Sequence, residues 1–266
     1  MPRAGTYQTE AIVIKKTRLG EADRILTFYT PDLGKVQAVA KGVRRPKSKL
    51  SGHLELLTHS SVLLTRGRNL DTIIGSQAID SFLPLKSNLE LGAFALYATE
   101  LVHQFGVERQ ENHTLFRLLL ELMLELGKKE PVANSPLDGE GRSAADGLLR
   151  YFEVHLLDAV GYRPQLQCCV ACRQLLPATG TSFSFASGGT VCPQCRSAQP
   201  YAISVSSGGL ETLRAVQNGD WSSARRLGAD ARTRRETELL LRTYLRYLLE
   251  RDIRSAGWLD MLRQKQ

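Results

Sequence analysis

The chain has 266 residues, of which 42% are hydrophobic, 23% charged and 7% aromatic. This composition is typical of a folded globular protein and excludes a largely disordered chain. No uncharged apolar run approaches the ~18 residues of a membrane span, and the N-terminus lacks the segments of a signal peptide. We therefore expect a cytoplasmic protein with no membrane partner.

The positive charge is concentrated at the start of the chain. The formal net charge is +8. Residues 1–80 carry 13 basic and 7 acidic side chains, residues 81–200 carry 10 and 12, and residues 201–266 carry 12 and 8. A polyanion would therefore meet the first third of the chain before the rest.

The first 80 residues predict a small β-barrel. Short runs rich in β-branched and aromatic residues alternate with turns that contain Gly or Asp. The expected strands are residues 7–16, 24–30, 35–40, 54–65 and 72–79. Five such strands favour an OB-type barrel, although an SH3-like barrel would give a similar pattern.

The pattern becomes helical after Pro84, because apolar residues then recur at spacings of three and four. Helices are expected at residues 89–105, 115–126, 148–160, 206–216 and 233–251. Residues 130–147, rich in Pro, Gly and Ser, predict a surface loop. Thr233 with Glu236 fits a capping box at the start of the last helix.

The five cysteines all lie between Cys168 and Cys195. Cys169-x-x-Cys172 and Cys192-x-x-Cys195 each allow one tight turn to direct two sulfurs at the same ion. Two such turns predict a zinc ribbon with one structural Zn²⁺ per chain and no open coordination position. The alternatives are a redox dithiol and thiols that fall at this spacing by coincidence. Cys168 is left out of the ligand set, because two intervening residues fit a metal turn better than three.

A second motif is the basic run that begins at Lys41, on a loop between two expected strands. Six basic residues and no acid lie between Asp32 and Glu55. We expect phosphate contacts from Lys35, Lys41, Arg44, Arg45, Lys47 and Lys49, extended by Lys15, Lys16, Arg18 and Arg24. The alternatives are a solvated loop with no partner, or a site on the later helices at Arg225, Arg226, Arg232, Arg234 and Arg235.

The aromatic residues near this run are Phe28, Tyr29 and Phe82, and we interpret each as a core residue. Backbone contact without sequence specificity is therefore expected rather than base stacking or base readout.

The sequence predicts no catalytic residues and no small-molecule substrate. It has no phosphate loop of the GxxxxGK[ST] type, no GxGxxG after a strand and no GxSxG elbow. His53 and Glu55 upstream of a CxxC pair superficially resemble a zinc deaminase. That interpretation is rejected, because four cysteines complete the metal shell and leave no position for water.

Several short segments together resemble the RecO family of bacterial recombination mediators. They are residues 20–27 (GEADRILT), 34–35 (GK), 38–42 (AVAKG), 44–45 (RR), 111–112 (EN), 115–116 (LF), 161–164 (GYRP), the cysteine pairs and 188–189 (GG). The resemblance covers essentially the whole chain. One departure is Arg173, where a Gly commonly follows the second cysteine, and this bears on the turn rather than on the ligands.

The resemblance implies an α+β multidomain protein, with an N-terminal OB barrel and a helical domain that carries the zinc module. The expected domains are residues 1–82, residues 83–164 with 201–266, and the inserted module 165–200. It also implies a non-enzymatic role in the RecFOR pathway of DNA repair: binding single- and double-stranded DNA, annealing complementary strands, and helping RecR load RecA onto DNA coated by single-strand-binding protein. On DNA the protein would be associated with the nucleoid. The alternatives are a protein–protein adaptor and an RNA-binding OB protein.

Overall fold

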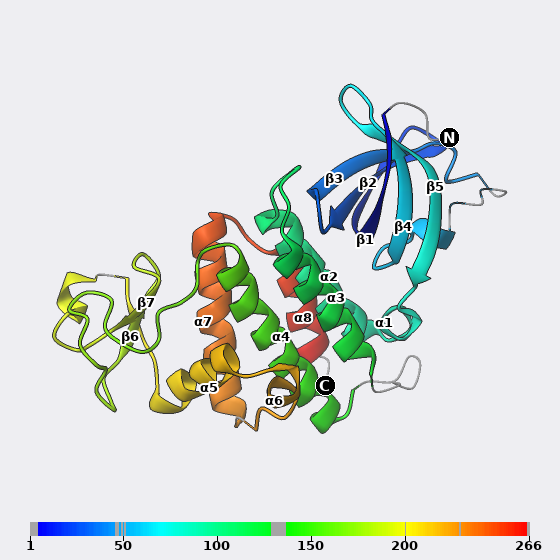
Figure 1. The fold of residues 1–266 in the computed structure, drawn as a ribbon. Helices are drawn as coiled ribbons and strands as arrows, with labels where there is room; N and C mark the ends of the chain where they lie inside the picture. The colour runs from blue at the N-terminus through cyan, green and yellow to red at the C-terminus, as the bar shows by residue number, and fades with distance from the viewer. Residues whose placement is uncertain are drawn as a thin grey trace. The chain divides into compact units, whose positions relative to one another are not determined.

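The computed structural model of the chain describes residues 5–45, 48, 50, 52–128, 137–199, 201–228 and 230–264. The chain divides into two compact units (Figure 1). Unit 1 comprises Met1–Pro136 and Ile253–Gln266, and unit 2 comprises Leu137–Asp252. Within the described ranges, no helix is both long and apolar enough to cross a membrane.

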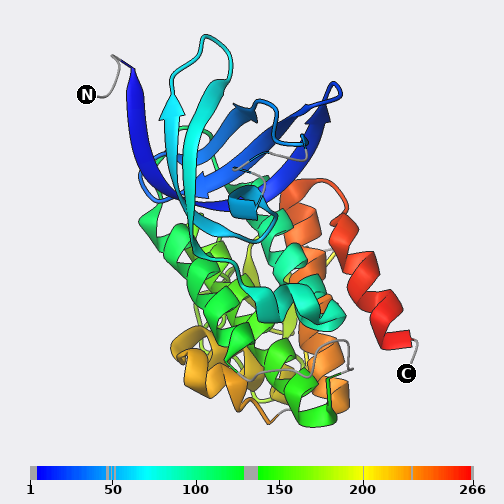
Figure 2. The same cartoon turned by 90° about the vertical axis from the view of Figure 1, so that its right-hand side faces the viewer.

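Unit 1 contains a closed five-stranded barrel. Its strands are β1 (Thr6–Leu19), β2 (Asp23–Thr30), β3 (Gly34–Ala40), β4 (His59–Thr65) and β5 (Asp71–Asp80), in the order β1-β2-β3-β5-β4. Every neighbouring pair is antiparallel except β3 and β5. The β4–β5 hairpin extends beyond the rest of the barrel (Figure 2). This architecture confirms the OB-type barrel that the sequence predicts.

Alternation along the strands fills the barrel. Val36, Ala38 and Ala40 of β3 point inward and are buried, whereas Lys35 and Gln37 are only half-buried. Phe28, Tyr29 and Phe82 are also buried, in agreement with their interpretation as core residues. In β3 the period of two thus separates the interior from an outer face, whereas Ala11–Ile14 of β1 and Leu26–Thr30 of β2 are buried on both faces.

The fourth strand is shorter than predicted. Residues 54–58 are apolar enough to continue a strand, but a 3-10 turn, η1 (Gly52–Leu54), and a left-handed residue, Leu57 with φ 60°, precede β4. The backbone N–H of Leu57 donates to Val13 O at 3.0 Å. Leu54 and Leu57 are buried, so this run lines the core instead of extending the sheet.

The helices of unit 1 are α1 (Leu83–Ser87), α2 (Leu89–Phe105), α3 (His113–Gly127) and α8 (Arg254–Gln264). Asn88 and Asn112 cap α2 and α3, because their side chains accept hydrogen bonds from N–H groups of the first turn. Glu100 of α2 accepts hydrogen bonds from the backbone N–H of Arg254 at 3.0 Å and of Ser255 at 2.7 Å. This carboxylate therefore holds the start of α8 against α2.

The loop between α2 and α3 covers an open stretch of the barrel. Strand β3 pairs with β5 only at Ala38 and Val39, which leaves the edge at Lys35 available. There the N–H of Lys35 donates to Val107 O at 3.0 Å, and the N–H of Arg109 donates to Lys35 O at 3.2 Å. A Cβ on Gly34, which has φ 54°, would lie 2.1 Å from a loop carbonyl oxygen. The loop thus satisfies strand groups that would otherwise be unpaired.

Unit 2 contains α4 (Gly139–Ala159), α5 (Ser207–Asn218), α6 (Trp221–Arg225) and α7 (Ala231–Leu249). The prediction of a loop up to residue 147 is wrong for residues 139–147, which form the first turns of α4; residues 130–136 lie outside the described ranges. Asp138 caps this helix by accepting from the N–H of Gly141 at 2.5 Å. Gly147 is needed for packing, because a Cβ at this position would lie 2.1 Å from Ala224 O.

The predicted capping box at Thr233 is also wrong. Asp230 is the N-cap of α7 and accepts from the N–H groups of Arg232 and Thr233. Glu236 instead accepts from the N–H of Ser206 at 2.6 Å. It therefore links α7 to the start of α5 rather than closing its own helix.

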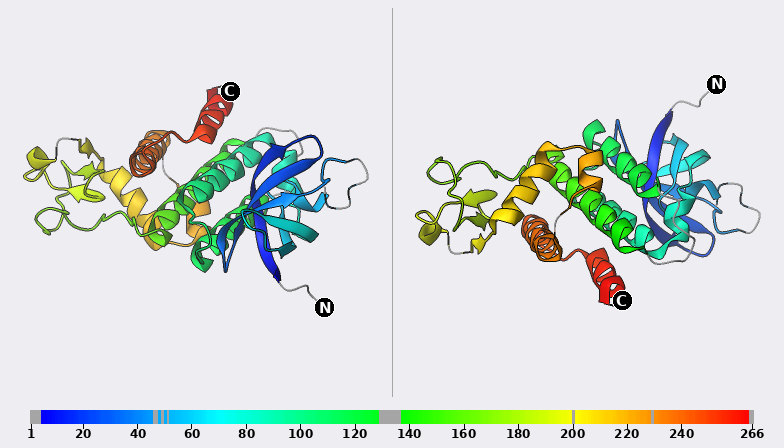
Figure 3. Two further views of the ribbon diagram at one scale, coloured as in Figure 1. Left: turned by 90° about the horizontal axis from the view of Figure 1, so that it is seen from above. Right: turned by 90° about the horizontal axis from the view of Figure 1, so that it is seen from below.

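The cysteine segment forms a small module of unit 2, set beyond α5 in both views of Figure 3. It contains β6 (Ser182–Ser184), β7 (Gly189–Val191), β8 (Ile203–Ser204) and the 3-10 turn η2 (Arg196–Ala198), with the sheet order β7-β6-β8. Phe183 is buried and meets Tyr244 of α7 edge-on, with ring centroids 5.3 Å apart. This aromatic contact anchors the module to the helices.

Candidate metal centre and nucleic-acid interface

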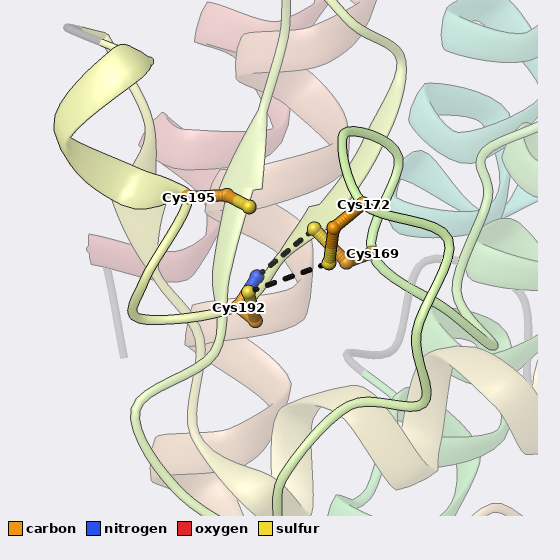
Figure 4. Close-up of side chains that lie close together, drawn as sticks. All are labelled: Cys169, Cys172, Cys192 and Cys195. Atoms are coloured by element: carbon orange, nitrogen blue, oxygen red, sulfur yellow. Dashed lines mark hydrogen bonds between the residues drawn. The ribbon is translucent and has the colours of Figure 1, made fainter.

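The sulfur atoms of Cys169, Cys172, Cys192 and Cys195 converge on one point of the module (Figure 4). They all lie within 4.8 Å of one another. Cys172 Sγ and Cys192 Sγ are 3.8 Å apart, far longer than the ~2.05 Å of a disulfide, and all four cysteines are free. Four unlinked thiols around one point are a donor set that could hold one metal ion.

Two tight turns bring these thiols together. The N–H of Arg173 donates to Cys169 O at 2.9 Å, and the N–H of Cys195 donates to Cys192 O at 3.1 Å. The first turn is fixed to β7, because the N–H of Val170 donates to Thr190 O at 2.9 Å. Backbone bonds therefore set the position of the cluster.

Cys168 and Arg173 lie on either side of the first cysteine turn. Cys168 is not part of the sulfur cluster; its carbonyl accepts from Thr190 Oγ1 at 3.2 Å. Arg173 has φ 65°, the left-handed conformation that favours glycine. The turn is thus compatible with the arginine that departs from the family pattern, at a steric cost of roughly 1–2 kcal/mol.

The cluster favours thiolate at one cysteine. Burial would raise the pKa of the Cys169 thiol, but hydrogen bonds from the backbone N–H groups of Cys172 and Cys192 lower it to about 6. Hydrogen bonds to the neighbouring sulfurs, first to Cys192 and then to Cys172, raise the pKa of Cys195 to about 12. A bound cation deprotonates its thiol ligands, so metal binding at this cluster would release protons.

A group of basic side chains, here called the turn patch, surrounds the β1–β2 turn: Arg18, Lys41, Arg44 and Arg45. Arg44 Nη1 donates to Glu21 O at 2.7 Å and to Gly20 O at 3.3 Å. All four are exposed, and Arg18, Lys41 and Arg45 form no ion pair within the described ranges. Arg44 thus shapes the turn, while the other three are exposed cations without an ion pair.

The other basic residues that the sequence singled out are more constrained. Lys16 and Arg24 both pair with Glu55, Arg24 at 3.7 Å. Lys15 Nζ lies 3.1 Å from His103 Nε2, and Lys35 Nζ donates to His103 O at 3.0 Å. Lys47 and Lys49 lie outside the described ranges. The structure therefore divides the described members of the predicted set into cations without an ion pair and cations that contact Glu55 or His103 of α2.

The chain is similar in sequence to known proteins along almost its whole length. The family models described as recombination protein O N terminal and C terminal match residues 1–82 and 86–256. A DNA repair protein RecO of Dehalococcoides mccartyi (strain CBDB1) is 43% identical over 99% of this chain and 98% of its own. A protein with the same description from Roseiflexus sp. (strain RS-1) is 41% identical over 98% and 88%. The chain belongs to the RecO family.

Membership in the RecO family confirms the resemblance that the sequence predicted. One family model spans the barrel, and the other spans the cysteine module and the helices from α2 to α7. A more distant RecO relative, from Pelotomaculum thermopropionicum, is 35% identical over 97% of this chain and 95% of its own. The family is one of DNA repair proteins.

Sequence reasoning missed two exposed arginines of this RecO-family barrel. Arg66 and Arg68 lie on the β4–β5 hairpin, between the fourth and fifth expected strands. The signal was available, because two arginines flank the turn glycine and no acid lies between Arg66 and Leu70. The first carboxylate after them, Asp71, is 2% exposed.

Proposed function

We propose that this RecO-family protein is a non-enzymatic recombination mediator that binds single- and double-stranded DNA without sequence specificity. It anneals complementary strands and acts with RecR to load RecA onto DNA covered by single-strand-binding protein. This work takes place in the cytoplasm, at the nucleoid. The observation that carries the proposal is the turn patch on an OB-type barrel, in a chain that belongs to a DNA repair family.

Electrostatics support this role. Arg18, Lys41 and Arg45 hold exposed charge at one end of the barrel, where Arg44 fixes the turn that carries it. Cations of this kind contact phosphates and carry no sequence information. A surface that neutralises two backbones reduces their mutual repulsion, so complementary strands can approach while base pairing supplies the specificity.

We further propose that the metal is a structural Zn²⁺ bound by the four cysteines, in a module at residues 165–200 that is inserted between residues 83–164 and 201–266. A tetrahedral shell with Zn–S bonds of ~2.3 Å has S–S edges of about 3.8 Å. The separation of Cys172 Sγ and Cys192 Sγ, 3.8 Å, agrees with such an edge. Four protein ligands leave no position for water, so the ion contributes to folding rather than to a reaction.

The test is a titration of labelled single-stranded oligonucleotide at a series of salt concentrations. The variant replaces Arg18, Lys41 and Arg45 with Ala, and Arg44 is kept so that the turn stays formed. If each cation neutralises one phosphate, the slope of log affinity against log salt should decrease by about 2, at ~0.7 per phosphate.

The control replaces the three constrained cations Lys15, Lys16 and Arg24 with Ala, which removes the same charge. A smaller change of slope is expected, because each already has a partner. Equal slopes for the wild type and the turn-patch variant would move the site elsewhere, and no binding by the wild type at low salt would favour the adaptor alternative. Competition between RNA and DNA of equal length distinguishes the RNA-binding alternative.

A further inference from the structure

The β4–β5 hairpin, residues 66–70, carries two arginines and no acid. Both Arg66 and Arg68 are exposed, and neither forms an ion pair within the part of the chain that the structure describes. The guanidinium carbon of Arg66 lies 5.8 Å from the centre of the Tyr7 ring, a cation–π contact that orders its side chain. The hairpin therefore presents a doubly positive tip beyond the barrel (Figure 2).

A buried carboxylate fixes the base of this hairpin. Asp71 Oδ1 accepts from the N–H of Gly67 at 3.2 Å, and its Oδ2 accepts from the Tyr7 hydroxyl and from Arg109 Nη2, the latter at 2.6 Å. A Cβ on Gly67 would lie 1.9 Å from Leu70 O, so the turn admits only glycine without rearrangement. The hairpin is thus held by one acid, two strands and the α2–α3 loop.

This arrangement is more than a soluble turn requires. Burying a carboxylate is unfavourable unless its partners compensate the lost hydration. Arg109 reaches Asp71 from a left-handed backbone, φ 58°, which is itself strained in a non-glycine residue. Both features fix the base of the hairpin that carries Arg66 and Arg68, and a loop that is already ordered loses less conformational entropy when it binds a ligand.

We propose that Arg66 and Arg68 form a second phosphate-binding site, which takes the sugar–phosphate backbone of single-stranded DNA. The inference rests on the proposed function and extends it to a residue pair that lies outside the turn patch. In OB barrels the face of β2 and β3 lies between the β1–β2 and β4–β5 loops, and oligonucleotides bind there. In this chain Leu26–Thr30 of β2 are buried on both faces, so the DNA strand would contact the barrel at the turn patch and at the hairpin rather than across β2.

The outer face of β3 offers little to a nucleic acid. Lys35 Nζ donates to His103 O at 3.0 Å, and Gln37 Nε2 donates to Glu108 Oε1 at 3.1 Å. The third outward residue, Val39, is half-buried and not aromatic, so the phosphate contacts at the two loops carry the binding. Asp71, Tyr7 and Arg109 are positioning residues in this scheme, since they hold the hairpin without contacting the nucleic acid.

The experiment compares three full-length proteins in salt-dependent titrations with a labelled single-stranded oligothymidine. They are the wild type, the Arg66→Ala/Arg68→Ala variant and a matched control, Arg117→Ala/Arg251→Ala, which removes two exposed arginines of α3 and of the segment after α7. The hairpin variant should reduce the salt slope by about 1.4, since each lost phosphate contact contributes ~0.7. The control should keep the wild-type slope.

The outcomes separate the inference from the function on which it rests. If the wild type does not bind at low salt, the proposed function is wrong. If the wild type binds and the hairpin variant keeps its slope, only the second site is wrong. A control that lowers the slope as much as the hairpin variant also overturns the site, because net charge would then explain both. Melting temperatures within 2 °C of the wild type establish that the variants are folded.

Discussion

Replacement of Asp71 with Asn tests whether one buried acid holds the barrel, the hairpin and the α2–α3 loop together. The substitution keeps the shape but removes the charge that accepts from Arg109 and Tyr7. Loss of a charge-assisted bond and of an acceptor for a second donor costs about 2–3 kcal/mol. The cost is below the ~3–5 kcal/mol of a fully buried pair, because Arg109 is 45% exposed and water can solvate it.

The variant should melt roughly 5–10 °C below the wild type, at ~2–4 °C per kcal/mol for a body of this size. Hydrogen exchange of barrel peptides, measured at a series of urea concentrations, assigns the loss of stability to unit 1. The backbone amides of Gly67 and Arg109 should exchange faster than in the wild type. Asp32→Asn, at an exposed carboxylate, is the control and should change stability by less than ~0.5 kcal/mol. An Asp71 variant as stable as this control, with unchanged exchange at both amides, would refute the reasoning.

The same carboxylate gives the stability a pH dependence. Burial would raise the pKa of Asp71, but hydrogen bonds from Tyr7 and Arg109 lower it below its ordinary value. Because the folded pKa is the lower one, the contribution is complete above the unfolded pKa of ~3.9 and is lost as the pH falls through the folded pKa. The stability difference between the wild type and Asp71→Asn should therefore disappear in that acidic range.

Three further predictions concern unit 2. Arg173→Gly should stabilise the cysteine module by up to about 1 kcal/mol, because glycine relieves the left-handed strain but also makes the unfolded chain more flexible, which offsets part of the gain. Urea unfolding followed by hydrogen exchange of peptides in residues 165–199 measures this change. A less stable variant would contradict it. Metal analysis should find one zinc per native chain, and the absence of zinc from native protein would contradict the assignment. Chelation or Cys169→Ser should raise hydrogen exchange in residues 165–199, while barrel peptides stay protected. Gly147→Ala should destabilise unit 2 by ~1–3 kcal/mol, because its Cβ would meet a backbone oxygen of α6. The control, Gly127→Ala, should not destabilise the protein, because no atom lies within 4 Å of the added Cβ. Equal unfolding midpoints for the two variants would show that α4 and α6 can separate without cost.

Local patterns predicted the features that depend on nearby residues. Short runs of β-branched and aromatic residues between turns located the five barrel strands, and the paired CxxC spacing located the sulfur cluster, because both are set within a few residues along the chain. Residues 54–58 were predicted to be part of a strand because they are mostly apolar. Apolar residues indicate burial but not conformation, and Leu54 reaches the barrel core from a turn.

The ionic partners could not be read from the sequence. Lys16 meets Glu55 only once the barrel closes, and Arg109 reaches Asp71 only once the α2–α3 loop lies along β3. Glu236 was assigned to its own helix because helical spacing favours that pairing, whereas the tertiary contact with Ser206 prevails. The sequence therefore located the basic residues correctly, but which of them lack an ion-pair partner is decided only when the barrel closes.

The α2–α3 loop has a consequence for how the barrel could be studied or could evolve. The boundary between the two family segments falls near residue 82, yet the edge of β3 obtains its hydrogen bonds from residues 107 and 109. A fragment that stops at that boundary would carry unsatisfied strand groups at Lys35 and would tend to associate edge to edge with its own copies. The N-terminal family segment thus depends on the segment that follows it to complete the hydrogen bonds of its own sheet.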